Sequence, residues 1–412
     1  MQNILLLPAY FAPENVASNH LDDNRNEAFV NANFSIIVYT PMPTRGVDDD
    51  LRRKYLKNKI EMMYNGKMVV HRFSLFKEGK NPINRAFRYA LCCFKQIYFS
   101  IFEKNIHVIY VASTPPIQGA MAALIKKIKR VPLVYNLQDI FPDSLVGTGL
   151  AKKGGFIWKI GRFIENFTYR NADKIIVISE DFKRNIMAKG VPESKIEVIY
   201  NWVDHNTVIS VKREDNILFD RYNLDRDKFY VTYCGNIGLT QNMDMLLDVA
   251  KEMSAEQDIH FVLVGEGAYK KEVENIIRQR DIRNVTLLPF QPYKEISHVF
   301  SLGDVGLIIS KPSVGENSVP SKTWSIMSAE RPVIANFDEN ELKTIIENNN
   351  CGLFTKAGDK TAFKAAILNL YKNTELKEKM GKNGRQFILD NLTKEIGTSK
   401  YVEVVKSLLK DK

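Results

Sequence analysis

A lysine stands at the start of a predicted helix, directly after a polar loop. The two segments together read VGENSVPSKTWSIMSAE over residues 314–330, with Pro320 and Ser321 immediately before Lys322. Pro320 stiffens the entry to the helix, and Ser321 occupies the position where an N-cap residue is expected. An anionic group held here would meet free backbone N–H donors, the positive end of the helix and the Lys322 ammonium. The alternative interpretation is a capped helix that carries a surface lysine.

Two glycine-rich turns precede this loop in the chain. CGNIGLTQNMD places Gly235 and Gly238 between a predicted strand and a predicted helix, and VGEGAYKKEVE places Gly265 and Gly267 in the same setting. Backbone N–H groups that no side chain shields could approach a phosphate at such turns. Strand-to-helix turns also use glycine for their geometry alone, so either turn by itself is a weak signal. The order of the three loops in one domain favours a shared site for phosphate.

The elements that must position these loops form two series of short β-rich runs. Helical stretches separate several of the runs, a pattern that predicts parallel α/β sheets. We therefore predict two doubly wound, Rossmann-like domains that face a central cleft, with ligands bound near the carboxyl ends of the strands. The runs are 3–8, 34–41, 108–113, 132–137, 174–179 and 196–201 in the first series, and 229–238, 259–267, 284–290, 305–310 and 332–337 in the second.

The boundaries of these domains follow from the composition of the connecting segments. A polar stretch at residues 203–228 lacks a long apolar period and marks the seam. We predict an N-terminal domain at 1–205 and a C-terminal domain at 206–380. Residues 381–412 are predicted to be helical and to pack back on the N-terminal domain.

The size and composition of the chain agree with two folded domains. The chain has 412 residues, more than one hydrophobic core usually serves, and its 45% hydrophobic and 26% charged residues are typical of globular proteins. The apolar run at residues 4–7 is too short for a signal-peptide core, and no run of about 18 apolar residues suggests a membrane span. The spacing of the four cysteines suits neither a metal site nor a disulfide scaffold. We expect a cytoplasmic protein whose thiols fill its cores.

The basic charge lies in the first half of the chain. The formal net charge is +10, with +11 in residues 1–200 and −1 in residues 201–412. Segments 81–102 and 152–170 mix Lys and Arg with aromatic side chains, as in helices that lie on anionic lipid. Solvated helices whose lysines cover a core are the alternative, and no nucleic-acid-binding motif accompanies the charge. The side chains predicted to face lipid are Arg85, Arg88, Lys95, Lys159 and Arg162, with Phe87, Phe94, Trp158 and Phe163 at the acyl boundary.

Eight short motifs occur in an order that resembles a known family. They are YFAPE, STPPIQG, LQDIFPDS, NADKIIVISE, VIYNWVD, CGNIGLTQNMD, VGEG and VPSKTWSIMSAERPVIA, and they extend over nearly the whole chain. The set in this order is similar to the retaining glycosyltransferases of family 4 with the GT-B fold, in particular their bacterial capsule and O-antigen branch. The resemblance implies an enzyme that moves a sugar from a nucleotide-sugar, usually a UDP-sugar, to a lipid-diphosphate-linked saccharide in O-antigen (lipopolysaccharide) or capsule synthesis.

The same resemblance assigns the donor to the second domain and the acceptor to the first. The residues expected to take part in catalysis are Gln138, Asp139, Glu316 and Lys322. The residues expected at the donor are Gly235, Asn236, Gly238, Gln241, Gly265, Glu266, Gly267, Phe290, Asn317, Ser318, Val319, Pro320, Ser321 and Ser325. Those expected on the acceptor side are Asn15, Ser18 and Asn19.

Several positions depart from the pattern of the family. Relatives often carry two glutamates seven residues apart, whereas Ser325 stands at the second position here and Asn317 at the first, with Glu316 one residue out of register. Either Glu316 or Asn317 could therefore hold the sugar hydroxyls. Many relatives have a paired Arg and Lys after the first glycine turn, whereas Gln241 and Asn242 stand in that region here. We therefore expect Lys322 to be the main cation on the diphosphate, with a lysine from elsewhere in the chain as the alternative.

The implied reaction displaces UDP from an anomeric carbon. Its barrier reflects the charge that develops on the leaving diphosphate, which preorganised donors and a cation stabilise. The family implies attack of the acceptor hydroxyl on the leaving-group face, without a protein nucleophile. The adjacent acids at residues 48–50 cannot converge on one ion in an extended chain, and we expect neither a metal nor another cofactor.

The partners implied are an undecaprenyl-diphosphate-linked saccharide and the anionic inner face of the cell membrane, without nucleic acid. A GT-B-like UDP-sugar epimerase is the first alternative, because it would bind the same donor and isomerise it without an acceptor. A dinucleotide-dependent oxidoreductase is the second. It is disfavoured because a second glycine turn and the loop before Lys322 have no role in it.

Overall fold

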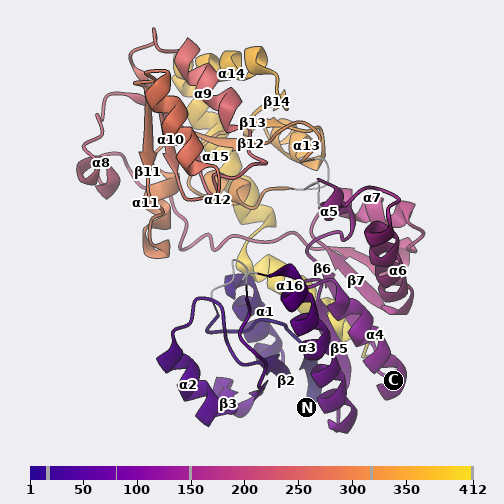
Figure 1. Cartoon of the computed structure of the whole chain (residues 1–412). Helices are drawn as coiled ribbons and strands as arrows, with labels where there is room; N and C mark the ends of the chain where they lie inside the picture. Colours follow the sequence, from indigo (N-terminus) through magenta and orange to yellow (C-terminus); the bar gives the residue numbers. More distant parts are fainter. Residues whose placement is uncertain (15–18, 80, 148–150, 316–318, 410–412) are drawn as a thin grey trace. The chain divides into compact units, whose positions relative to one another are not determined.

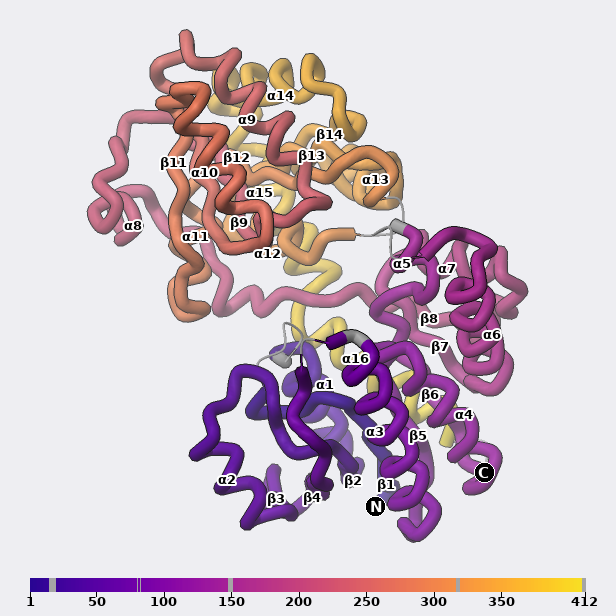
Figure 2. Tube along the Cα trace, in the orientation of Figure 1, coloured from indigo at the N-terminus to yellow at the C-terminus, as the bar shows by residue number. Residues whose placement is uncertain are grey.

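The computed structural model describes residues 1–14, 19–79, 81–147, 151–315 and 319–409 (Figure 1). The chain divides into two compact units, one formed by Met1–Tyr200 with Gly397–Lys412 and the other by Asn201–Ile396. In the trace of Figure 2 the yellow C-terminal helix lies among the indigo and purple elements of the first unit. Each unit is built on one mainly parallel sheet, as the alternation of runs predicts.

The sheet of the first unit winds outward from its centre in both directions. β1 pairs in parallel with β2 on one side and with β5 on the other, and the strand order is β3-β4-β2-β1-β5-β6-β7-β8. Only the edge strand β3 runs antiparallel to its neighbour among the described strands. The strands are β1 (Gln2–Leu6), β2 (Phe34–Pro41), β3 (Ile60–Met63), β4 (Met68–Phe73), β5 (Val108–Ala112), β6 (Leu133–Leu137), β7 (Lys174–Val177) and β8 (Ile196–Val198).

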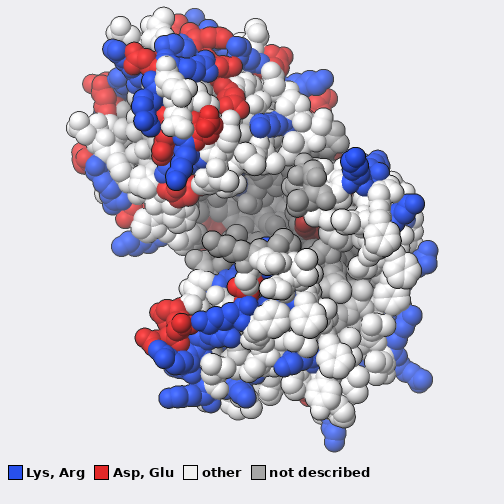
Figure 3. Space-filling model, viewed as in Figure 1, with Lys and Arg blue, Asp and Glu red and all other residues white. Residues whose placement is uncertain are grey.

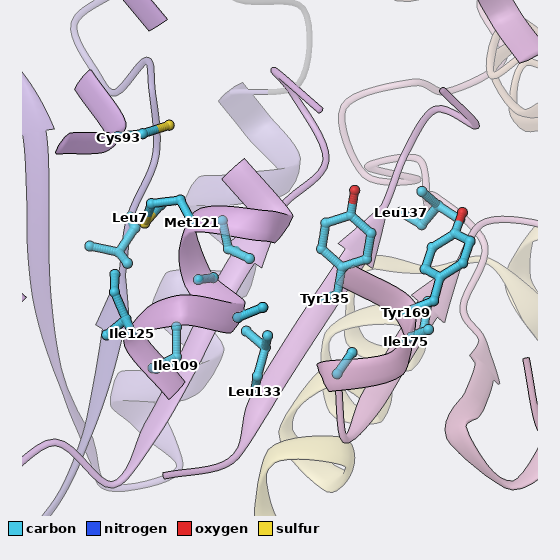
Figure 4. Close-up of a cluster of buried hydrophobic side chains, with 14 of the residues drawn as sticks. Leu7, Cys93, Ile109, Met121, Ile125, Leu133, Tyr135, Leu137, Tyr169 and Ile175 are labelled. Carbon is cyan, nitrogen blue, oxygen red and sulfur yellow. The ribbon is translucent and has the colours of Figure 1, made fainter. Parts of the chain in front are cut away.

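Helices cover both faces of this sheet. Successive side chains of a strand point to opposite faces, so Ile109 of β5 joins the core cluster that Figure 4 shows, while Tyr110 points to the other side. There the Tyr110 ring lies 6.0 Å from Phe29 and 6.3 Å from Tyr401, between ring centres. The helices are α1 (Asn19–Asn31), α2 (Asp49–Lys57), α3 (Pro82–Phe102), α4 (Ile117–Lys129), α5 (Asp143–Gly147), α6 (Phe156–Asn171), α7 (Glu180–Ala188) and α16 (Lys394–Ser407).

The second unit repeats the doubly wound plan with a smaller sheet. Its strand order is β11-β10-β9-β12-β13-β14, and every pair is parallel. The strands are β9 (Phe229–Cys234), β10 (Ile259–Val264), β11 (Val285–Leu288), β12 (Val305–Ile309), β13 (Val333–Phe337) and β14 (Gly352–Lys356). The helices are α8 (Ile217–Arg221), α9 (Met243–Glu252), α10 (Lys270–Gln279), α11 (Ile296–Phe300), α12 (Lys322–Ser328), α13 (Glu341–Asn348), α14 (Lys360–Lys372) and α15 (Thr374–Asn391).

The C-terminal helices are divided between the two units. A Cβ atom on Gly381 would lie 2.3 Å from the carbonyl oxygen of Glu330, and one on Gly384 would lie 3.2 Å from Cγ of Met327, so α15 packs closely on the second unit. The chain returns to the first unit at Gly397, inside α16. The predicted segment 381–412 is therefore shared, and the first boundary falls at Tyr200 rather than at residue 205.

The four cysteines occupy the cores, as predicted. Cys92, Cys93, Cys234 and Cys351 are all buried and free. Burial raises the pKa of each thiol to about 12. These thiols therefore stay protonated and act as small apolar side chains.

Candidate active site

The register of β9 and β10 places the two glycine-rich turns side by side. Cys234, the last residue of β9, pairs with Val264, the last residue of β10. The N–H of Gly235 donates to the carbonyl oxygen of Val264 at 2.9 Å, and a Cβ atom on Gly265 would lie 1.9 Å from the carbonyl oxygen of Gly235. Gly265 also has a φ of +151°. Close backbone packing therefore requires glycine at residue 265.

The same contact continues one step further along the two turns. Ile237 donates its N–H to the carbonyl oxygen of Glu266 at 2.8 Å and accepts from the N–H of Tyr269 at 3.0 Å. A Cβ atom on Gly267 would lie 2.1 Å from the carbonyl oxygen of Ile237. The two turns therefore form one backbone-bonded platform at the carboxyl edge of the sheet.

The N–H groups of the first turn are already engaged in this platform. Gly235 and Ile237 donate to backbone carbonyls, and Gly238 donates to Oε1 of Gln241 at 3.0 Å. The bare N–H groups predicted at Gly235 and Gly238 are thus hydrogen-bonded within the protein, and their contact with a phosphate stays a prediction. The side chain of Gln241 therefore helps to fix the conformation of the first turn.

Lys322 brings a cation to this platform. Its ammonium donates a hydrogen bond to Oη of Tyr233 at 2.8 Å and lies 4.0 Å from the centre of that ring. A Cβ atom on Gly235 would lie 3.3 Å from Nζ of Lys322, so the glycine leaves space for the ammonium beside the turn. Tyr233 in turn donates to the carbonyl oxygen of Asn236 at 2.6 Å. A hydrogen-bonded chain therefore fixes the ammonium against the first turn.

The surroundings of Lys322 perturb its titration. Desolvation lowers the pKa of this ammonium to about 8, and the nearby Cys234 opposes the shift only in part. The contacts of the Lys322 ammonium are with Tyr233, and among the described residues no carboxylate forms an ion pair with it. The charge of the ammonium is therefore not neutralised by this part of the chain, and an anion placed beside it would be attracted strongly.

The segment around Lys322 differs in one respect from the prediction. Ser321 precedes α12 as expected, but it has helical dihedral angles and its side chain makes no capping hydrogen bond. The N-cap role predicted for Ser321 is therefore wrong. Val319, Pro320 and Ser325 are partly buried around the start of the helix.

The described flank of the preceding loop is held by β13 and α13. Asp338 accepts hydrogen bonds from the N–H groups of Ser313 at 2.9 Å and Gly315 at 2.7 Å. Asn340 donates its amide to the carbonyl oxygen of Gly315 at 2.9 Å. The predicted residues Glu316, Asn317 and Ser318 lie outside the described residues.

Two further predicted donor residues lie beyond the platform. Phe290 follows β11 and is exposed, as an aromatic side chain available for stacking would be. The carboxylate of Glu266 pairs with Lys270 one helical turn later, at 2.6 Å. The role of Phe290 and Glu266 toward a ligand stays a prediction.

The predicted residues of the first unit follow β6. The N–H groups of Gln138 and Asp139 donate to Oγ of Ser113 at 3.0 and 3.3 Å, and the Gln138 amide donates to Asn136 at 2.9 Å. Desolvation raises the pKa of Asp139, although a hydrogen bond from Ser144 opposes it. Asn15 and Ser18 lie outside the described residues, and Asn19 begins α1.

Tyr233 is the functional candidate that the sequence analysis missed. It lies in the buried strand β9, where an aromatic residue is expected for packing alone. The available signal was its position, one residue before the strand ends and two before Gly235. A polar tip at the carboxyl edge of a central strand can reach the site while its ring stays in the core.

The first unit also exposes the aromatic side chains that were predicted to meet lipid. Phe87, Phe94 and Phe163 are exposed on α3 and α6. Two of the five predicted cations do not fit this role, because Arg88 is fully buried and Arg162 is largely buried in an ion pair with Glu165. None of the helices in the described part of the chain has the length and apolar composition of a membrane span.

Two family models match the chain and together account for most of its length. The model described as Glycosyltransferase Family 4 matches residues 27–207. The model described as Glycosyl transferases group 1 matches residues 214–387. The two matches follow the two units of the structure. They give no support to the epimerase alternative.

Several relatives named as glycosyltransferases share part of the sequence. WcaI of Escherichia coli (strain K12), named for colanic acid biosynthesis, is 28% identical over 208 residues, which is 50% of this chain and 51% of that protein. WbjE of Pseudomonas aeruginosa is 24% identical over 68% of this chain and 69% of that protein. CapM of Staphylococcus aureus, named for capsular polysaccharide biosynthesis, is 23% identical over 76% and 80%. The match to WcaI thus spans about half the length of that relative.

Solved structures resemble the chain over its full length. Anabaena Alr3699/HepE in complex with UDP superposes with a TM-score of 0.73 at 16% identity, covering 99% of this chain and 100% of that chain. Sucrose-phosphate synthase from Thermosynechococcus elongatus superposes with a TM-score of 0.78 at 15% identity, covering 100% of both chains. At these identities the likeness shows the fold alone.

Proposed function

The chain belongs to the glycosyltransferases of family 4, which have the GT-B fold, and we propose that it transfers a sugar from a nucleotide-sugar during polysaccharide synthesis. The single observation that carries this proposal is the position of the Lys322 ammonium, which Tyr233 holds beside the first glycine turn. No carboxylate among the described residues pairs with this ammonium. A cation in this position suits a diphosphate leaving group. HepE, a neighbour in fold, has been crystallised with UDP and with UDP-glucose, which favours a UDP-sugar as the donor.

The proposed chemistry is displacement of the nucleoside diphosphate with retention at the anomeric carbon. Negative charge develops on the leaving phosphate, and a preorganised cation stabilises that charge more in the transition state than in the bound donor. The acceptor hydroxyl attacks on the leaving-group face and passes its proton to a phosphate oxygen. Gln138 and Asp139 in the first unit are proposed to orient the acceptor.

The proposed acceptor is an undecaprenyl-diphosphate-linked saccharide at the inner face of the cell membrane. WcaI is named for colanic acid biosynthesis and CapM for capsular polysaccharide biosynthesis, which supports an acceptor in polysaccharide synthesis. The exposed face of α6 combines Phe156, Ile157 and Phe163 with Lys159, a composition suited to an anionic lipid surface. In Figure 3 blue side chains border the largely white surface over α3 and α4. We propose peripheral binding through this unit.

A donor screen tests the proposal directly. UDP-, GDP- and dTDP-sugars are added in turn to the full-length protein, and thermal shift and release of nucleoside diphosphate are measured. A UDP-sugar is expected to raise the melting temperature of the wild type and to raise it much less in Lys322→Ala. Stabilisation of both proteins to the same extent would separate Lys322 from the donor. Conversion of the sugar without any acceptor would point to the epimerase instead.

A further inference from the structure

Glu78 lies at the centre of a polar cluster in the first unit. Its carboxylate accepts from Nε and Nη2 of Arg45 at 3.0 and 2.8 Å, pairs with Nε of Arg85 at 3.0 Å and accepts from Oη of Tyr10 at 2.9 Å. Desolvation raises the pKa of Glu78, but the hydrogen bonds from Arg45 and Tyr10 outweigh it and lower this pKa to about 2. Glu78 is therefore ionised and fully occupied by its neighbours.

The cluster carries more positive than negative charge. Arg45 and Arg85 share the single carboxylate of Glu78, and their side chains are 35% and 42% exposed, whereas Glu78 is 9% exposed. Tyr89 completes the group, with Oη 2.7 Å from Oη of Tyr10 and 3.3 Å from Nη2 of Arg85. Guanidinium groups present paired donors that match phosphate oxygens. The accessible side of this group, the Glu78 cluster (Tyr10, Arg45, Glu78, Arg85 and Tyr89), therefore suits an anion.

A third guanidinium supports the same segment from below. Arg88 is fully buried, and its Nε donates to the carbonyl oxygen of Phe76 at 3.1 Å. Its Nη1 and Nη2 have no hydrogen-bond partner among the described residues. The carbonyl that Arg88 holds belongs to Phe76, two residues before Glu78 in the chain. Arg88 therefore fixes the segment that carries Glu78.

The fold places this cluster where parallel sheets bind ligands. Tyr10 follows β1, Arg45 follows β2 and Glu78 follows β4, so all three extend from the carboxyl ends of neighbouring strands. The segment before Glu78 is fixed by donors to its backbone carbonyls, from Lys95 to Ser74 at 2.7 Å and from Arg52 to Leu75 at 3.2 Å. The cluster is therefore held in place before any ligand arrives.

An exposed apolar stripe begins at Phe76, two residues before Glu78 in the chain. Phe76 and Phe87 stack with ring centres 6.1 Å apart and are 42% and 64% exposed. Their neighbours along α3 recur at intervals of about four or seven residues, which places them on one side of the helix over roughly 30 Å. These exposed neighbours are Ile83, Phe94, Tyr98 and Phe102.

The geometry points to the Glu78 cluster as the binding site for the diphosphate of a lipid-linked saccharide, with the lipid chain following the exposed stripe of α3. This inference rests on the proposed function, because it names the part of the first unit that recognises the acceptor. The apolar stripe distinguishes a prenyl diphosphate from free phosphate as the occupant. Free phosphate would use Arg45 and Arg85 but not the aromatic stripe, whereas a prenyl diphosphate uses both.

Farnesyl diphosphate is the probe for this site, and isothermal titration calorimetry on the full-length protein is the measurement. Arg45→Gln/Arg85→Gln is expected to weaken its binding roughly tenfold or more, because two charge-assisted hydrogen-bond donors are lost. Arg53→Gln/Arg184→Gln is the matched control, since it removes two exposed, ion-paired arginines of the same unit. The control is expected to bind like the wild type. Equal affinity in the wild type and Arg45→Gln/Arg85→Gln would overturn the proposal.

The variant Phe87→Ser tests the contact with the lipid chain independently of the contact with the phosphate groups. It is expected to weaken farnesyl diphosphate severalfold and to leave inorganic pyrophosphate unchanged, because Phe87 offers only apolar contact. Loss of affinity for both ligands to the same extent, or for neither, would contradict the stripe as the path of the chain. Because Phe87 is an exposed side chain, this variant should fold even where the double arginine variant does not.

Two parallel measurements distinguish failure of this inference from failure of the proposed function and from a general contact with lipid. UDP binding is followed in the same variants. If the wild type binds UDP but not farnesyl diphosphate, the acceptor site is rejected and the proposed function stands. If the wild type does not bind UDP, the proposed function is rejected. Vesicles of phosphatidylglycerol test a general lipid contact. A variant that loses vesicle binding and keeps farnesyl diphosphate would assign the cluster to the bulk membrane and overturn the proposal.

Discussion

The ammonium of Lys322 rests on Tyr233, 2.8 Å from its hydroxyl oxygen and 4.0 Å from the centre of its ring. Both contacts attract a cation without neutralising it, because the phenol is uncharged. A carboxylate in the same place would have cancelled the charge. Tyr233 therefore positions Lys322 and leaves its charge available to an anionic ligand.

Lys322→Ala should remove most transferase activity while the protein stays folded. The lost contact is a charge-assisted one to the leaving diphosphate, worth about 1.5 to 3 kcal/mol, or roughly 10- to 150-fold in kcat/KM. Steady-state kinetics with the donor found in the screen give the value. Lys343→Ala is the control, because Lys343 pairs with Glu339 on the surface of the same unit. Normal turnover in Lys322→Ala would make Lys322 an ordinary lysine.

The pH profile of kcat/KM should fall above pH about 8. Desolvation lowers the pKa of Lys322 to about 8, and the neutral amine formed above that pH no longer attracts the diphosphate. Tyr233→Phe removes the oxygen that accepts from the ammonium, so the charged form is less favoured and the fall should move to lower pH.

Tyr230→Phe is the matched control for this profile. Tyr230 lies in β9 with Tyr233, and its hydroxyl donates to the carbonyl oxygen of Asp225 at 2.8 Å instead of contacting Lys322. The control should keep the wild-type profile even if it lowers stability. Superimposable profiles of Tyr233→Phe and wild type would exclude Tyr233 as the positioning residue.

Lys322→Met should stabilise the protein without ligand at pH 7. The folded state holds this lysine at a pKa of about 8 instead of 10.5, so the unfolded state binds the proton more tightly. Below pH 8 the wild type therefore bears a cost of at most about 3 kcal/mol, which disappears as the pH rises toward 10.5. The free energy of unfolding in urea, measured at pH 7 and pH 10, checks this. A difference between the two proteins that does not shrink with pH would refute the assigned cause.

Gly265→Ala should lower the unfolding free energy of the second unit. The loss should exceed that caused by replacing a glycine whose added Cβ would meet no other atom. The new Cβ would lie 1.9 Å from the carbonyl oxygen of Gly235, which forces the two turns apart. Gly190→Ala is the control, since Gly190 also has a positive φ, +88°, but nothing within 4 Å of the added atom. The control should cost about 1 to 2 kcal/mol and Gly265→Ala clearly more. Equal losses of unfolding free energy would show that the turns can separate.

The sequence predicts the sheets better than it predicts the contacts of the site. The apolar runs of β1, β9 and β10 are recognisable because strands buried on both faces are continuous in hydrophobic residues. The strands β3, β4 and β14 were missed. IEMM and GLFTK are partly exposed, and His71 and Arg72 interrupt the apolar run of β4 (MVVHRF). Local composition therefore identifies strands with a continuous apolar run and misses those that polar or exposed residues interrupt.

The site residues show the same division. Lys322 and the glycines were found because their types and spacing are visible in the chain. Tyr233 was missed because its role depends on a contact 89 residues away in sequence. Arg88 was assigned to the surface from the composition of α3, yet it is fully buried. Which side of a helix faces the core is decided by the packing of other elements, and a single sequence does not contain that.

The exposed lysines around α6 should bind the protein to anionic vesicles. Lys152, Lys153 and Lys159 are exposed beside Phe156 and Phe163, and each lysine near the surface is worth about 1 kcal/mol. Lys152→Glu/Lys153→Glu/Lys159→Glu should therefore lose co-sedimentation with phosphatidylglycerol vesicles, while UDP binding persists. The wild-type attraction should also weaken with added salt, because it is screened over about 10 Å at 0.1 M.

A charge-matched variant of the second unit tests whether the position of the lysines matters or only the net charge of the protein. Lys251→Glu/Lys271→Glu/Lys382→Glu reverses three exposed lysines and changes the net charge equally. If the α6 face is the membrane surface, this control should sediment like the wild type. Equal loss in both variants would mean that only the net charge matters, and absence of wild-type sedimentation at low salt would favour a soluble acceptor.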